Sequence, residues 1–180
     1  MSDPLFHLAG RVAVVTGGSG QLGRTYAVGL AERGARVASF DLLPGAEADG
    51  IRSYEVDVTD RSAIASAVDD VVSEWGVPHV LVNNAGLDSP PDAPTEEVGP
   101  FEDYPEDSFD AVLDVNVKGA FLCSQVVGGA MAKEGRGSIV NISSVYGLLS
   151  PVSPSVGCAS RASTSFPATC RTASVATRST

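Results

Sequence analysis

The sequence predicts an α/β fold in which a doubly wound parallel sheet is covered by helices on both faces. Short apolar runs alternate along the chain with longer segments whose apolar residues recur at helical spacing. This alternation is typical of parallel strands joined by right-handed crossover helices. The 180 residues of the chain fit a single domain of this kind.

The first strand is expected at residues 12–15, where four valine and alanine residues follow one another. A glycine-rich turn comes next, and the amphipathic run 21–33 predicts a helix that ends before Gly34. A strand, a tight glycine turn and a helix N-terminus together form an anion site, because free backbone N–H groups and the helix dipole favour a phosphate. Gly18, Gly20 and Gly23 fit the spacing G-x-G-x-x-G of a dinucleotide-binding turn, although such a turn can also be structural only.

The remaining elements follow in the same alternation. Four more strands are predicted, at residues 36–40, 54–58, 79–82 and 138–142. The first of these is followed by Asp41, and the second carries Asp57. The third runs into Asn83-Asn84-Ala85-Gly86, and the fourth is followed by Ser143-Ser144. Asp60 is expected to cap a helix whose buried face holds Ile64, Ala67, Val68, Val71 and Val72 and which ends near Trp75. A long helix is predicted at 108–132, carrying Asn116. The acidic segment 87–107, with its five prolines, is expected to be a surface loop.

Residues 151–180 differ in composition from the rest of the chain. They contain no acidic residue, so all 22 acidic residues precede Pro151, and no period of 2 or 3.6 is evident. We therefore expect two parts, a folded domain at 1–150 and a disordered tail at 151–180. Our hypothesis is that the tail arose by out-of-frame translation or another truncation.

Bulk composition limits the classes of partner. The net charge of −10 argues against binding to nucleic acid or to an anionic membrane. No apolar run is long enough for a membrane span, and the N-terminus lacks the features of a secretory signal. The three cysteines have no metal-ligand spacing and are odd in number, which favours a reducing cytoplasm over a disulfide framework.

Five motifs resemble those of the short-chain dehydrogenase/reductase family. They are Thr16-Gly-Gly-Ser-Gly-Gln-Leu-Gly23, Asp57, Asn83-Asn-Ala-Gly86, Asn116-Val-Lys-Gly119 and Asn141-Ile-Ser-Ser144, in the family's order and spacing over residues 8–150. The resemblance implies a Rossmann-like sheet that stops after its fifth strand, a nicotinamide cofactor, an alcohol or carbonyl substrate, and homo-oligomers among full-length relatives. One detail departs from the family form T-G-x-x-x-G-x-G: Gln21 stands where a glycine is usual.

The resemblance also assigns a cofactor site. Its residues would be Gly18, Gly20 and Gly23 at the pyrophosphate, Asp41 at the ribose and Asp57 at the adenine amino group. Gly17, Gln21, Leu22 and Val58 would also bind the cofactor, and Asn84, Ala85 and Gly86 would lie beside it. Asp57 could instead only cap a turn, and Asn84 could be only a turn residue. Asp41 favours NAD over NADP, because a carboxylate accepts from the ribose hydroxyls and repels a 2′-phosphate. Arg24 lies nearby and could contact a phosphate, but we interpret it as a solvent-exposed residue of the helix.

Catalysis in the family uses a serine, an asparagine, a tyrosine and a lysine. Ser144 matches the serine and Asn116 the asparagine, although Ser144 could merely end a strand and Asn116 could bond only backbone. The positions of the Y-x-x-x-K motif hold Gly157 and Arg161, and no tyrosine follows Tyr146, which is itself expected to be a loop or pocket residue. Three hypotheses remain open: a dehydrogenase impaired by the missing pair, a non-catalytic nucleotide-binding module, or a truncated chain without function.

Overall fold

The computed structural model describes residues 6–43, 45, 47–88 and 101–144. The predicted boundary at residue 150, the tail 151–180, Tyr146, Gly157 and Arg161 lie outside the described residues. Within the described part, no helix combines the length and the apolar character needed to cross a membrane.

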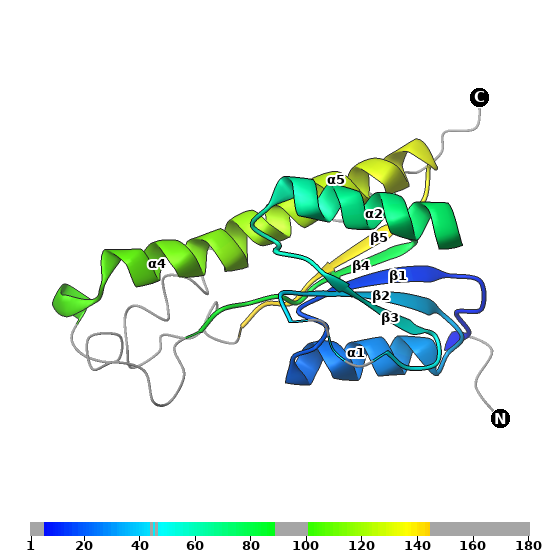
Figure 1. Ribbon diagram of the computed structural model, residues 1–180, viewed down its shortest axis with the longest axis horizontal. Coiled ribbons are helices and arrows are strands. Elements are labelled where there is room, and N and C mark those ends of the chain that lie inside the picture. The colour runs from blue at the N-terminus through cyan, green and yellow to red at the C-terminus, as the bar shows by residue number, and fades with distance from the viewer. Residues whose placement is uncertain (1–5, 44, 46, 89–100, 145–180) are drawn as a thin grey trace.

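Five parallel strands form one sheet (Figure 1). They are β1 (Val12–Thr16), β2 (Arg36–Asp41), β3 (Ile51–Glu55), β4 (Val80–Asn83) and β5 (Ser138–Asn141). Their order across the sheet is β3-β2-β1-β4-β5. After β1, the chain adds β2 and β3 on one side of it, and then adds β4 and β5 on the other side. This order confirms the predicted doubly wound, Rossmann-like sheet.

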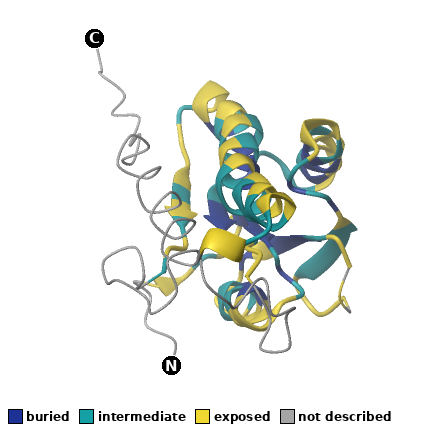
Figure 2. Ribbon diagram, turned by 90° about the vertical axis from the view of Figure 1, so that its left-hand side faces the viewer, coloured by how far each residue is buried: buried dark blue, intermediate teal, exposed yellow. Residues whose placement is uncertain are grey.

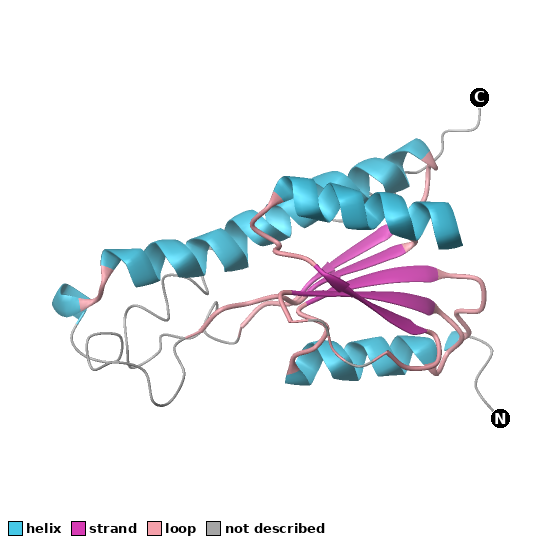
Figure 3. Cartoon of the chain, viewed as in Figure 1, coloured by secondary structure: helices cyan, strands magenta, loops and turns pink. Residues whose placement is uncertain are grey.

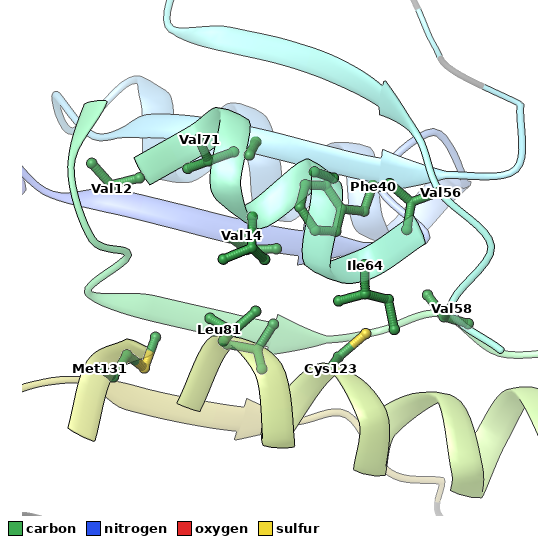
Figure 4. Close-up of a cluster of buried hydrophobic side chains, with 14 residues drawn as sticks. Val12, Val14, Phe40, Val56, Val58, Ile64, Val71, Leu81, Cys123 and Met131 are labelled. Atoms are coloured by element: carbon green, nitrogen blue, oxygen red, sulfur yellow. The ribbon is translucent and has the colours of Figure 1, made fainter. Parts of the chain in front are cut away.

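Helices cover both faces of the sheet (Figure 3). α1 (Gln21–Ala31) packs on one face, while α2 (Arg61–Trp75) and α5 (Ala120–Lys133) pack side by side on the other. The larger core lies beneath α2 and α5, where Val14, Phe40, Ile64, Leu81 and Cys123 meet (Figure 4). Buried residues concentrate in the central strands, and exposed residues gather on the outer surfaces of the helices (Figure 2).

The third strand lies earlier than predicted. It was expected at 54–58 with Asp57 on it, but β3 spans Ile51–Glu55, because its backbone pairs with β2 only as far as the Asp41–Glu55 pair. Val56 and Val58 stay buried beyond the last pair, so their alternation imitates a strand. Asp57 consequently lies in the turn that follows the strand.

The predicted long helix is continuous but irregular. It begins with α4 (Glu106–Leu113), just after the 3-10 turn η2 (Phe101–Asp103), and it runs into α5 through the π-helix η3 (Asp114–Gly119). Figure 1 shows that α4 extends beyond the end of the sheet. The wider π turn carries Asn116, and such turns are frequent at functional sites. The predicted cap of α2 is confirmed, since the Asp60 side chain accepts from the Ser62 amide.

Candidate functional site

A cleft lies at the carboxyl ends of the strands, beside the point between β1 and β4 where the strand order reverses. Ligands of doubly wound sheets bind at this position. The cleft has a volume of about 400 Å³, which suits a small-molecule ligand. Its lining residues are Gly17, Gly20, Gln21, Leu22, Gly23, Phe40, Asp41, Leu42, Val56, Asp57, Val58, Asn84, Ala85, Gly86, Leu87 and Val115. The structure thus brings together eleven of the twelve residues that the sequence suggested for cofactor binding, all except Gly18.

Glycines allow the turn after β1 to pack tightly. Gly17 has a φ of +62°, and a Cβ added there would lie 2.8 Å from the Ala85 Cα. A Cβ at Gly23 would lie 2.8 Å from the Asn84 Nδ2 and would overlap the Gly17 carbonyl. Gly18 faces away from the cleft, because a Cβ there would overlap the side chain of Ser39 on β2. Close packing against β2 therefore explains Gly18, and its contact with a pyrophosphate stays a prediction.

The N-terminus of α1 opens onto the cleft. No side chain caps this helix, and its first backbone bond runs from the Arg24 N–H to the Gly20 carbonyl at 2.9 Å. The N–H groups of Gln21, Leu22 and Gly23 precede that bond and make no backbone hydrogen bond to another described residue outside the helix. Free N–H groups and the positive end of the helix dipole make this wall of the cleft suitable for an anion.

Thr16 and Asn84 join the ends of β1 and β4. The Thr16 hydroxyl accepts from the backbone N–H groups of Asn84 and Ala85, each at 3.0 Å. The Asn84 Nδ2 donates to the Thr16 carbonyl at 3.0 Å and to the Gly17 carbonyl at 3.2 Å. Asn84 is therefore more than a turn residue: it fixes the glycine turn against the loop after β4. Sequence reasoning missed this role of Thr16, although Thr16 begins the glycine motif.

Two carboxylates hold the loops at the other end of the cleft. The Asp41 Oδ2 accepts from the Ser19 N–H at 3.0 Å, and its Oδ1 accepts from the Leu43 N–H at 3.2 Å. The Asp57 Oδ1 accepts from the N–H of Thr59 at 2.8 Å and from its hydroxyl at 2.7 Å. Asp57 thus makes the turn-capping contacts of the simpler interpretation, while it also lines the cleft. No lysine, arginine or histidine is among the described lining residues.

Asn116 is clamped onto the loop after β4. Its Oδ1 accepts from the Leu87 N–H at 2.7 Å, and its Nδ2 donates to the Leu87 carbonyl at 3.0 Å. Because Leu87 and Val115 both line the cleft, Asn116 holds the π-helix against its wall. As the simpler interpretation supposed, Asn116 bonds backbone, but the backbone belongs to a loop and not to the sheet.

Ser144 is placed differently from the other predicted residues. It is half-buried, three residues beyond β5, and it is not among the residues that line the cleft. The strand before it is tied to β4, since the Asn83 Nδ2 donates to the Asn141 Oδ1 at 2.7 Å and to the Ser124 Oγ at 2.9 Å. The structure therefore brings the cofactor residues together more closely than the catalytic ones.

Other reactive groups do not form a second centre in the described part. No group of three or more histidine, cysteine, aspartate or glutamate side chains there could hold a metal ion. Cys123 is a free thiol in the core, and burial raises its pKa to about 12, so it stays protonated.

Comparison with known proteins decides the family. Residues 11–170 match the family profile of short chain dehydrogenases. The chain belongs to this family. The match continues past residue 150, where sequence reasoning placed the end of the resemblance.

Individual relatives agree with this assignment. The chain is 39% identical over 152 residues to 3-alpha-(or 20-beta)-hydroxysteroid dehydrogenase from Mycobacterium tuberculosis, which covers 81% of this chain and 55% of that protein. A structure of NAD+-bound xylitol dehydrogenase superposes with a TM-score of 0.78 at 31% identity, over 91% of this chain and 64% of the other. A structure of ribose-5-phosphate isomerase from Brucella melitensis 16M superposes with a TM-score of 0.81 at 31% identity, over 91% of this chain and 63% of the other. The chain spans about half the length of the curated relative, and the different activities of the two solved structures show that the fold alone does not fix the reaction.

Proposed function

We propose that the chain is the cofactor-binding part of an NAD-dependent dehydrogenase or reductase that transfers a hydride between a nicotinamide and an alcohol or carbonyl compound. One observation carries the proposal: eleven residues suggested by the family motifs line a single cleft at the free N-terminus of α1. The glycines allow the turn to pack closely on the loop after β4, and the first N–H groups of α1, which lines the cleft, make no backbone hydrogen bond to another described residue outside the helix. These residues fit the pyrophosphate of a dinucleotide.

We propose NAD in preference to NADP because of the charge at the ribose end. Asp41 lines the cleft there, and the two residues after it, Leu42 and Leu43, are exposed and apolar. A 2′-phosphate would therefore meet a carboxylate and find no cation among the described lining residues. Each Asp41 carboxylate oxygen accepts one hydrogen bond from a backbone N–H group and keeps a lone pair that can accept from a ribose hydroxyl. The NAD+-bound state of the xylitol dehydrogenase structure supports this choice.

Each part of the site then has a task. The backbone of α1 and the glycine turn binds the pyrophosphate, Asp41 the ribose and Asp57 with Val58 the adenine. Asn116 orients the loop beside the nicotinamide, and Ser144 hydrogen-bonds the substrate oxygen. When bound, NAD supplies the acceptor or donor of the hydride.

The chain lacks the tyrosine and lysine that the family uses for proton transfer. A carbonyl oxygen that gains a hydride must also gain a proton. Gly157 and Arg161 occupy the positions of the family's tyrosine and lysine, and neither can supply the phenol. We therefore propose that these 180 residues bind NAD with impaired turnover; the alternatives are a non-catalytic nucleotide-binding module and a non-functional fragment.

The remaining proposals concern setting and partners. We propose a small-molecule substrate and no nucleic-acid partner, which the net charge of −10 supports. A cytoplasmic location is supported by the unpaired thiol of Cys123. Assembly into homo-oligomers is proposed for full-length relatives only.

A titration of NADH into the purified chain, followed by nicotinamide fluorescence, tests the function. We expect saturable binding, weaker binding of NADPH, and a reversal of this preference in Asp41→Ser. Turnover with a panel of alcohols and NAD is expected to be undetectable. Oxidation of an alcohol would contradict the proposed impairment, and absence of NADH binding together with absence of a cooperative melt in circular dichroism would favour the non-functional fragment.

A further inference from the structure

The cleft offers a pyrophosphate no cationic side chain among its described lining residues. Among its described lining residues the charged side chains are Asp41 and Asp57, both acidic. A pyrophosphate carries negative charge, so its binding here depends on hydrogen-bond donors and the helix dipole alone. We therefore asked which donors the cleft can offer beyond its backbone.

Among the lining residues that the structure describes, two side chains carry an N–H donor, Gln21 and Asn84. The two N–H bonds of the Asn84 amide are already directed to the carbonyls of Thr16 and Gly17. The Gln21 carboxamide, in contrast, makes no hydrogen bond to a described residue, whereas the Gln21 backbone carbonyl accepts from the Thr25 hydroxyl at 2.9 Å. Gln21 is therefore the one uncommitted side-chain donor in the described lining of the cleft.

The position of Gln21 is suited to this role. It is the first residue of α1, next to the free N–H groups, and its side chain is exposed. The flanking Gly20 and Gly23 are restricted, because a Cβ at Gly20 would lie 3.3 Å from the Gly17 carbonyl oxygen and one at Gly23 would lie 2.8 Å from Asn84 Nδ2. The turn thus accepts a side chain at residue 21, where the family usually has glycine.

We infer that the Gln21 carboxamide donates a hydrogen bond to the cofactor pyrophosphate, in addition to the backbone N–H groups at the start of α1. This inference rests on the proposed function and deepens it. The Gln21 side chain thus adds a neutral donor to a cleft whose described lining has no cationic side chain. It does so at a position where the family form T-G-x-x-x-G-x-G has glycine.

Three variants separate the donor from the size and charge of the side chain. Gln21→Met keeps the length and removes the donor, and we expect it to weaken NADH binding about tenfold. Gln21→Glu keeps the shape and adds a negative charge, so it is expected to weaken binding further. Gln125→Met makes the same chemical change at an exposed position of α5 that does not line the cleft, where Gln125 accepts from the Arg61 Nε, and it should leave NADH affinity unchanged.

Two further probes show which part of the cofactor is affected. ADP-ribose keeps the pyrophosphate and should lose affinity with Gln21→Met in the same proportion as NADH. Adenosine lacks phosphate and should bind the variant and the unaltered chain equally. Equal NADH affinity in Gln21→Met and the unaltered chain, or an equal loss for adenosine, would overturn the inference while the proposed function stands. If the unaltered chain fails to bind NADH, the proposed function fails first and the inference with it.

Discussion

The part of the site between β1 and β4 is joined by more hydrogen bonds and holds more of the predicted residues than the part beside β5. Between β1 and β4, side-chain and backbone hydrogen bonds join the glycine turn to the loop after β4, and nearly all predicted cofactor residues line one cleft. At β5, Ser144 lies outside the lining of that cleft. The described lining of the cleft comes from the ends of β1, β2 and β4, the start of α1, the turn after β3 and the π-helix η3, and none of it comes from β5.

The two faces of the sheet show the same difference. The core under α2 and α5 reaches from Val12 on β1 to Ile139 on β5, whereas the core under α1 ends at Val80 and Val82 on β4. Val140 on β5 is 44% exposed, because it points to the face of α1 and no described helix reaches it there. The β1 side of the site therefore rests on packing from both faces, and the β5 side on packing from one.

The largest expected effect comes from filling the glycine turn. In Gly23→Ala the added methyl group would overlap the Gly17 carbonyl and press on Asn84, so we expect loss of measurable NADH binding and about 2–3 kcal/mol of lost unfolding free energy. Gly29→Ala is the matched control in the same helix, since the nearest atom to its Cβ lies 3.9 Å away. That control should gain about 0.5–1 kcal/mol in urea denaturation. Normal NADH binding by Gly23→Ala would contradict the close packing of the turn.

The next effect concerns the link between β1 and β4. Asn84→Ala removes two hydrogen bonds to the carbonyls of Thr16 and Gly17. We expect a loss of about 1–3 kcal/mol in unfolding free energy, because buried carbonyls lose their partners, and about tenfold weaker NADH binding. Chemical denaturation and fluorescence titration measure the two quantities. A loss of stability with unchanged affinity would show that the link does not shape the cleft.

A smaller effect on NADH affinity is expected at Asn116 than at Asn84, and almost none at Ser144. Asn116→Ala breaks the clamp on Leu87 and is expected to weaken NADH binding about threefold, because one wall of the cleft loosens. Ser144→Ala is expected to leave NADH affinity within about twofold, since Ser144 does not line the cleft. Equal and large losses in both variants would show that the two ends of the site act as one unit.

The smallest expected effect is a pH dependence of stability. Burial lowers the pKa of His79 from its ordinary value of 6.5, and the neighbouring cations Arg136 and Arg11 lower it further, against Glu134, which raises it. Neutral His79 accepts the Val12 N–H on its Nδ1 at 3.2 Å. The unfolded chain therefore takes up the proton first, so this contribution is complete above pH 6.5 and is lost as the pH falls below it. In His79→Gln, which can accept the same N–H without titrating, the pH slope of the unfolding free energy should be smaller; an unchanged slope would contradict the assignment to His79.

Sequence patterns predicted the parts of the fold that are local. The apolar run of β1, the glycine turn and the cap Asp60 each depend on residues within a few positions of one another. Strand β3 was misplaced because Val56 and Val58 are buried beyond the last registered pair with β2, Asp41–Glu55. The π-helix was missed because one wider turn leaves the helical pattern of apolar residues on either side intact.

The sequence predicted most of the residues that form the site, but it did not predict the hydrogen bonds between them. Motifs named eleven of the sixteen residues that line the cleft. The link from Thr16 to Asn84 spans 68 positions and becomes visible only when β1 and β4 are adjacent. The clamp of Asn116 on Leu87 spans 29 positions and depends on the π turn. The free carboxamide of Gln21 likewise emerged only after the partners of Asn84 were known.

The most direct test of the central claim is an NMR titration of the isotope-labelled 180-residue chain with NAD. We expect the amide signals of Gly17, Gln21, Leu22, Asp41 and Gly86 to shift with one common dissociation constant, while those of Ser138 and Val140 on β5 stay in place. This result would show that the cleft between β1 and β4 binds the dinucleotide without help from the β5 end. Shifts confined to other surfaces, or no saturable shift in the glycine turn, would contradict the assignment of this cleft to NAD.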